Sequence, residues 1–123
     1  RNDFTIYLTT FPRGPYSYET GEFWLCIFWT NPIANFMHET LHFQFIHYWR
    51  NNPDSPVSKM SEDNFGDLKE ALTVVLDESL LPTIERPDEG YKSHAELREK
   101  LHRHWSRHRD FNLLVEFGTS LFK

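Results

Sequence analysis

The spacing of apolar residues predicts a chain that begins with strands and continues with helices. Residues 3–11 alternate apolar and polar side chains around Phe4, Ile6 and Leu8, which is the pattern of a half-buried strand. Residues 22–29 are apolar at nearly every position, which predicts a second strand, buried on both faces. We expect the two strands to form an antiparallel pair or part of a small sheet.

A long helix is predicted over residues 33–49. Asn31 can accept a hydrogen bond from a free backbone amide, and Pro32 at the first helical position lacks the amide that would go unpaired. No Pro or Gly follows before Pro53. At about 100° per residue, one broad apolar face carries Ile33, Ala34, Met37, Leu41, Phe45 and Tyr48, with His38, His42 and Trp49 along its margin. The two histidines are therefore expected to face a partly buried cleft.

Two further helices and a last helical or irregular segment complete the predicted fold. Ser61 is a good N-cap for a helix that reaches about Leu80, since Pro82 follows. Residues 93–96 have the S-x-x-E capping-box pattern and begin a helix that reaches about Arg109. Asp110 can cap a last segment over residues 111–122. The fold class is thus α+β, with a short antiparallel sheet packed on the helix of residues 33–49.

Composition places this fold in a single domain, residues 1–123. Aromatic residues make up 16% of the chain, enough to fill one core with few side chains. The net charge of −5 gives no reason to expect nucleic acid as a partner, and no apolar run is long enough to span a membrane. Cys26 is the only cysteine and is expected to be a small buried hydrophobic residue. With no disulfide and no signal peptide in view, the cytoplasm is the expected compartment.

Residues 38–42, His-Glu-Thr-Leu-His, form an H-E-x-x-H sequence inside the predicted long helix. Residues four apart on a helix lie one above the other, so His38 and His42 can bind one metal ion while Glu39 reaches the water bound to it. Two neutral histidines and a glutamate are costly to bury beside a core without a partner, and a metal ion provides one. The segment therefore predicts a zinc-hydrolase site with Glu39 as its base.

A catalytic zinc ion needs three protein ligands, so a third ligand is expected from another helix. Glu70 is our choice, because it lies 28 positions after His42, which leaves room for the chain to reverse and return as a helix. Glu70 lies almost opposite the apolar stripe of that helix, which is also where an ordinary solvated glutamate would be found. Asp77, two turns further on the same side, is the alternative ligand, followed by Glu78.

With this ligand pattern, residues 33–77 resemble the gluzincin metallopeptidases, in which an H-E-x-x-H helix is followed by a glutamate on a second helix. The resemblance is strongest to their shortest, single-domain members among uncharacterised bacterial proteins. It implies a minimal zincin-like fold, with His38, His42 and Glu70 as zinc ligands and Glu39 as general base.

The chain departs from the gluzincin pattern in two ways. Gluzincins commonly carry an Asp four residues after the ligand glutamate, where it orients a ligand histidine, and here that position is Val74. Thr73 or Asp77 is the expected substitute. The chain is also too short for a separate substrate-binding lobe, which bears on peptidase activity and not on metal binding.

Other histidines and a tyrosine are candidates for the same chemistry. Tyr91 and His94, just before the third helix, are further catalytic candidates, since a phenol or imidazole near the open zinc position can stabilise an oxyanion. An ordinary turn and cap is the alternative for both. His104 and His108 also lie four residues apart, but the arginines around them oppose a dication, which predicts a solvated basic face.

The function predicted from these residues is that of a zinc metallopeptidase. Zinc would polarise a peptide carbonyl of a peptide or protein substrate, and Glu39 would take a proton from the attacking water and return it to the leaving amine. The alternative is a non-catalytic zinc-binding interaction or sensor domain. The two hypotheses differ at Glu39, because a purely structural site does not need this carboxylate.

Overall fold

The computed structural model describes residues 3–28, 31–79 and 90–122, which form an α+β fold as the sequence predicts. The strands are β1 (Thr5–Thr9), β2 (Tyr16–Ser17) and β3 (Glu22–Cys26). The α-helices are α1 (Pro32–Phe45), α2 (Glu62–Ala71), α3 (Val74–Ser79), α4 (Ala95–His108) and α5 (Phe111–Ser120). A π-helix, η1 (Ile46–Arg50), and two 3₁₀ helices, η2 (Pro56–Lys59) and η3 (Lys92–His94), lie between them.

The sheet has the strand order β1-β3-β2, and the predicted antiparallel pairing of the first and last strands is wrong. β1 runs parallel to β3, with Thr5 opposite Glu22 and Thr9 opposite Cys26. Only β2 pairs with β3 in the antiparallel sense. The reason is the two-residue strand β2, which is too short to show an alternating pattern. It adds a second chain reversal between β1 and β3, and two reversals restore the original direction.

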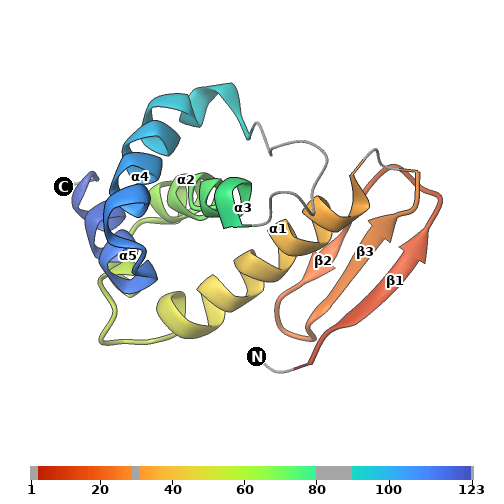
Figure 1. Ribbon diagram of the computed structural model, residues 1–123. Helices are drawn as coiled ribbons and strands as arrows, with labels where there is room; N and C mark the ends of the chain where they lie inside the picture. Colours follow the sequence, from red (N-terminus) through yellow and green to blue (C-terminus); the bar gives the residue numbers. More distant parts are fainter. Residues whose placement is uncertain (1–2, 29–30, 80–89, 123) are drawn as a thin grey trace.

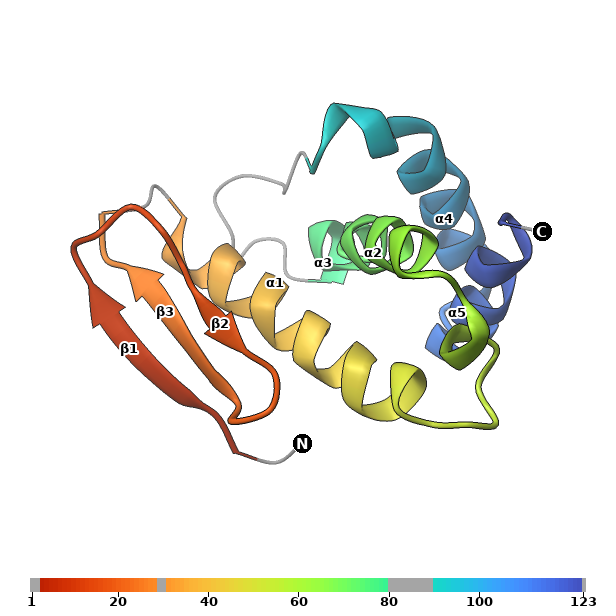
Figure 2. The same ribbon diagram turned by 180° about the vertical axis from the view of Figure 1, so that it is seen from behind.

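α1 lies between the sheet and the other helices, as both ribbon views show (Figures 1 and 2). On the sheet side, the rings of Phe23 and Phe43 have centroids 5.8 Å apart. Burial alternates along β3, where Phe23 and Leu25 are buried and Trp24 is only partly covered. The prediction of a strand buried on both faces is therefore wrong, because α1 covers one face only. Cys26 is buried with a free thiol, as predicted.

The start of α1 confirms the prediction made from its first residues. The Asn31 side chain accepts a hydrogen bond from the backbone amide of Ala34 at 3.2 Å, and Pro32 occupies the first turn. The helix then continues into the π-helix η1, so helical backbone extends to Arg50. The H-E-x-x-H residues consequently lie in the middle of a continuous helical segment.

The buried face of α1 differs from the predicted apolar face. Ile33 and Tyr48 were assigned to that face, yet they are 50% and 52% exposed. Instead, α1 is buried at His42, Phe43 and Phe45. Because the helix is covered by the sheet on one side and by helices on the other, its buried arc is wider than one stripe. His42 lies in the interior and not at a margin.

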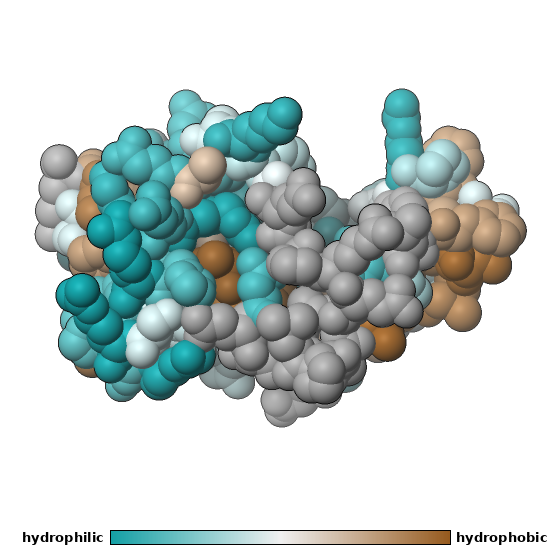
Figure 3. Space-filling view, turned by 45° about the horizontal axis from the view of Figure 1, so that its top comes forward, coloured by the Kyte–Doolittle hydropathy of each residue, from teal (hydrophilic) through white to brown (hydrophobic). Residues whose placement is uncertain are grey.

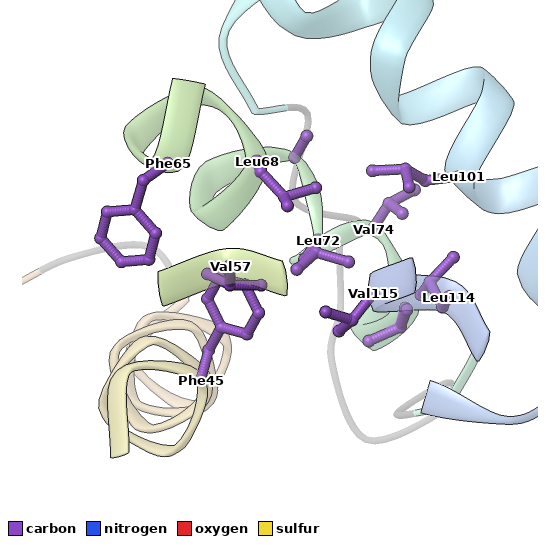
Figure 4. Close-up of a cluster of buried hydrophobic side chains, with 11 residues drawn as sticks. Phe45, Val57, Phe65, Leu68, Leu72, Val74, Leu101, Leu114 and Val115 are labelled. Atoms are coloured by element: carbon purple, nitrogen blue, oxygen red, sulfur yellow. The ribbon is translucent and has the colours of Figure 1, made fainter. Parts of the chain in front are cut away.

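The main hydrophobic core lies on the helical side of α1, between its C-terminal end, η2 and the four other α-helices (Figure 4). Its largest fully buried side chains are Phe45, Val57, Leu68, Leu72, Leu101, Leu114 and Val115. Phe45 of α1 stacks on Phe65 of α2, with ring centroids 5.8 Å apart. This packing fixes α2 against α1. It therefore also fixes which α2 side chains lie level with the histidines along α1.

The second predicted helix begins as expected but is broken into α2 and α3. The Ser61 side chain accepts a hydrogen bond from the Asn64 amide at 3.3 Å, which confirms the predicted N-cap. At the break, the Thr73 hydroxyl donates to the backbone carbonyl of Glu70 at 2.8 Å. Such a local hydrogen bond competes with the regular helical pattern. The predicted end of this helix at Leu80 lies outside the described residues, as does Trp29 at the end of the predicted second strand.

Of the two N-terminal caps predicted for the C-terminal helices, one is absent and one is formed. The capping box is not formed, because Ser93 lies within η3 and α4 begins after His94, whose side chain makes no capping hydrogen bond. Asp110 does cap α5, and its side chain accepts a hydrogen bond from the Leu113 amide at 3.1 Å. Arg109, between the helices, adopts the left-handed conformation with φ 51° that lets α5 turn back along α4.

Apolar residues are also exposed at the end of the molecule that carries the sheet (Figure 3). Leu8 and Phe28 are 70% and 73% exposed. Within the described ranges, no helix is long and apolar enough to cross a membrane.

Candidate metal centre

His38, Glu39 and His42 lie together on the middle turns of α1. The two imidazole rings have centroids 4.3 Å apart and meet edge to face. Donor atoms of these three residues can be chosen that all lie within 4.8 Å of one another, so the group has the geometry to hold a metal ion. His42 has only 3% of its side chain exposed, whereas His38 has 22%, so the pair reaches from the interior to the surface.

Glu70, the ligand chosen from the sequence, is brought to the histidines by α2. Its Oε2 atom lies 3.3 Å from Nε2 of His38 and 3.7 Å from Nε2 of His42. Two donor atoms that bind one tetrahedral zinc ion at about 2.1 Å are about 3.4 Å apart, so these separations suit a shared ion. The structure thus brings His38, His42 and Glu70 together, and their role as ligands stays a prediction.

The electrostatics of Glu70 favour its ionised form. Burial acts to raise its pKa, but the hydrogen bond to His38, the neighbouring His42 and the ammonium group of Lys69 outweigh burial and hold the pKa at about 2. A carboxylate that is ionised at neutral pH and has 20% of its side chain exposed is suited to binding a cation from solvent.

Glu39 lies beside the same histidines, and 25% of its side chain is exposed. Its Oε2 is buried, accepts no hydrogen bond from any described residue and lies 3.9 Å from Nδ1 of His42. Burial raises the pKa of this carboxyl group; His38 and Lys69 act in the opposite direction, and the charge of Glu70 adds to the rise. A buried oxygen of this kind, next to three donors for a metal, is placed to exchange a proton with a reactant.

Asp77, the alternative ligand, has a different partner in the structure. Its carboxylate accepts a hydrogen bond at 3.3 Å from Arg98 of α4, whose side chain is 7% exposed. Arg98 also donates to the Thr73 hydroxyl at 2.7 Å. Through Arg98, Thr73 and Asp77 therefore attach the α2–α3 break to α4. This attachment also positions Glu70, which lies just before the break. The side chain of Glu78, the third choice, lies outside the described residues.

Tyr91 and His94 are not brought to the histidine pair. His94 Nε2 lies 2.9 Å from Oδ1 of Asp67, and its ring packs on Tyr91, which is 62% exposed. Within the described part of the chain, neither residue makes a hydrogen bond, ion pair or ring contact with His38 or His42. A catalytic role for Tyr91 or His94 finds no support in these contacts, which are those of a turn that packs on α2.

Two residues that sequence reasoning missed lie in the site. Lys69 is buried and its ammonium group reaches both Glu70 and His42. Tyr18, from the turn between β2 and β3, contacts the same ammonium group at 3.4 Å, and burial is the main cause that raises the pKa of its phenol. The sequence offers one faint signal, a lysine directly next to the proposed ligand, but its burial depends on packing against Tyr18.

Comparison with known proteins adds no relative to this description. No protein-family model, curated protein or solved structure matches the chain. The interpretation of the site therefore depends on its residues and their geometry.

Proposed function

We propose that this chain is a zinc-dependent metallopeptidase that hydrolyses peptide bonds. The observation that carries the proposal is the convergence of Glu70 Oε2 on the Nε2 atoms of His38 and His42, at 3.3 and 3.7 Å. Two imidazoles and one carboxylate are the ligands of several catalytic zinc sites, and they leave a fourth position open. The donor set present therefore fits zinc.

The carboxylate next to this donor set favours hydrolysis over other metal chemistry. Two histidines and one carboxylate also suit the iron of non-haem oxygenases. Glu39, however, supplies an additional carboxylate with a buried oxygen that accepts no hydrogen bond from the described residues. A hydrolytic site needs a base at this position, which is why we propose zinc and hydrolysis.

The proposed roles follow from burial and pKa. Zinc, when bound, would lower the pKa of water at the site to about 7 and polarise the substrate carbonyl. Glu39 would take a proton from the attacking water and deliver it to the leaving amine. Its raised pKa suits this task, because a base works best when its pKa is near the working pH. His38 and Glu70 are partly exposed and would admit the metal, while buried His42 would anchor it.

The test is the substitution Glu39→Gln, assayed against a broad peptide library with zinc added. We expect the variant to keep the fold and zinc binding but to lose hydrolysis by about a hundredfold or more, the contribution typical of a general base. Glu99→Gln is the matched control, because Glu99 is an exposed partner of Arg103 on α4. Equal hydrolysis by Glu39→Gln and by the wild type would contradict the catalytic proposal.

A second candidate function is a zinc-binding interaction or sensor domain without turnover. Lys69 favours this candidate, since a cation inside the site opposes permanent occupation by a metal. A sensor would bind zinc through His38, His42 and Glu70 but show no hydrolysis in the wild type. The same peptide assay therefore separates the two functions.

A further inference from the structure

Lys69 is a buried cation inside the proposed metal site. It directly precedes Glu70 on α2, and 11% of its side chain is exposed. Lysine is rarely buried to this degree unless its charge is compensated. The groups around its ammonium therefore bear on how the site can bind a metal.

The ammonium group is surrounded by residues from three elements. It donates to Oε1 of Glu70 at 2.7 Å and to the Tyr18 hydroxyl at 3.4 Å, and it lies 3.4 Å from Nδ1 of His42. The rings of Tyr16 and Tyr18 lie 6.0 and 5.9 Å away, within the range of cation–π attraction. Lys69 is thus compensated by the same Glu70 and His42 that would bind the metal.

This contact favours the tautomer of His42 whose ring proton is on Nε2. An ammonium group only donates, so the Nδ1 atom that faces it acts as acceptor. By this assignment, which follows from the hydrogen-bond partners, the ring proton is on Nε2. Nε2 is the atom that faces Glu70 at 3.7 Å. A protonated nitrogen has no lone pair for a metal, so this arrangement withholds His42 from coordination.

The charge of Lys69 acts in the same direction. Its ammonium group neutralises the charge of the Glu70 carboxylate, as a bound metal cation would do. A dication between His38, His42 and Glu70 would stand close to this ammonium in a partly buried site, where like charges repel more strongly than in water. Metal binding therefore requires Lys69 to withdraw from His42.

We propose that Lys69 is a built-in competitor of the metal: it holds Glu70 and His42 in the metal-free protein and lowers the affinity of the site for a divalent cation. The inference rests on the proposed metal site. Its consequence is that the site fills only at a higher concentration of free zinc than it would without Lys69.

The test is a zinc titration of the metal-free protein against a chromophoric chelator. Lys69→Met is expected to bind zinc at least about tenfold more tightly than the wild type, because repulsion is removed and His42 is released. Lys59→Met is the matched control, since Lys59 is exposed on η2 and its loss changes the net charge equally. The control is expected to stay within about twofold of the wild type.

A second variant separates charge from packing. Lys69→Gln keeps a hydrogen-bond donor for Glu70 without the charge, and it is expected to bind zinc more tightly as well. Adding His38→Ala to either variant should abolish the gain, which locates the binding at this site. Thermal melting of the metal-free variants shows that each is folded.

The outcomes distinguish the inference about Lys69 from the proposed metal site. Tighter binding by the Lys69 variants supports the inference, also if the wild type binds no measurable zinc. Equal or weaker binding, with the wild-type site still lost in His38→Ala, overturns the inference and leaves the metal site intact. No binding by the wild type or by any Lys69 variant overturns both.

Discussion

The chain contains two histidine pairs with the same spacing on a helix, His38 with His42 on α1 and His104 with His108 on α4. Their ring centroids are 4.3 and 4.4 Å apart, so helical spacing brings the two rings equally close in both pairs. The pairs differ in what the rest of the fold places against them.

The first pair meets a carboxylate from another helix, and the second meets an aromatic ring and positive charge. His104 stacks on Phe117 with centroids 4.4 Å apart, and burial, followed by His108 and Arg107, lowers the pKa of His104. The adjacent pocket of about 220 Å³ is lined mainly by basic residues, Lys100, Arg103, His104, Arg107 and His108, together with Phe117. Helical spacing thus forms a pair of imidazoles, and the two pairs differ in the carboxylate that tertiary packing brings to the first one.

Removing that carboxylate should have the largest effect. Glu70→Gln is expected to lower zinc affinity by more than about a thousandfold, because losing a charged ligand exceeds the 10- to 100-fold cost of losing a group that only orients a ligand. Asp77→Asn is the matched control and should lower affinity by about tenfold or less, since Asp77 pairs with Arg98. Competition with a chelator measures both. A larger loss in Asp77→Asn would make Asp77 the third ligand.

The next effect concerns the attachment of α2 and α3 to α4. Arg98→Met is expected to destabilise the metal-free protein by about 3 kcal/mol, because it leaves Asp77 without its buried partner. Arg103→Met removes an exposed ion pair with Glu99 and should cost about 1 kcal/mol or less. Urea unfolding measures both variants. Equal stability of the two would show that Arg98 does not hold the helix break.

The smallest effect is expected at the second histidine pair. His104→Ala and His108→Ala should leave zinc affinity within about twofold of the wild type, since the basic groups around them oppose a dication. The same chelator competition applies. A loss of one bound zinc ion in either variant would remove the distinction between the pairs.

Sequence reasoning succeeded where a feature depends on neighbours along the chain. The caps at Asn31, Ser61 and Asp110 each need one side chain and an amide three residues later, and all three are formed. The capping box at Ser93 is the exception, because Ser93 itself lies in the 3₁₀ helix that precedes α4.

The failures depend on contacts between distant residues. The burial of Lys69 requires Tyr18, which is 51 positions away, and the pairing of Arg98 with Asp77 spans 21 positions. The parallel pairing of β1 with β3 followed from a two-residue strand that leaves no periodic pattern. The proximity of Glu70 to the histidines was expected from the sequence, but the cation beside it was not.

The central claim is that His38, His42 and Glu70 bind one metal ion, and it is tested most directly by zinc titration of four metal-free proteins in parallel: the wild type, His38→Ala, Lys69→Met and His108→Ala. The wild type and His108→Ala should each bind about one zinc ion per chain, and His38→Ala should bind none. A stoichiometry that is unchanged in His38→Ala, or a wild type and Lys69→Met that both fail to bind zinc, would contradict the account.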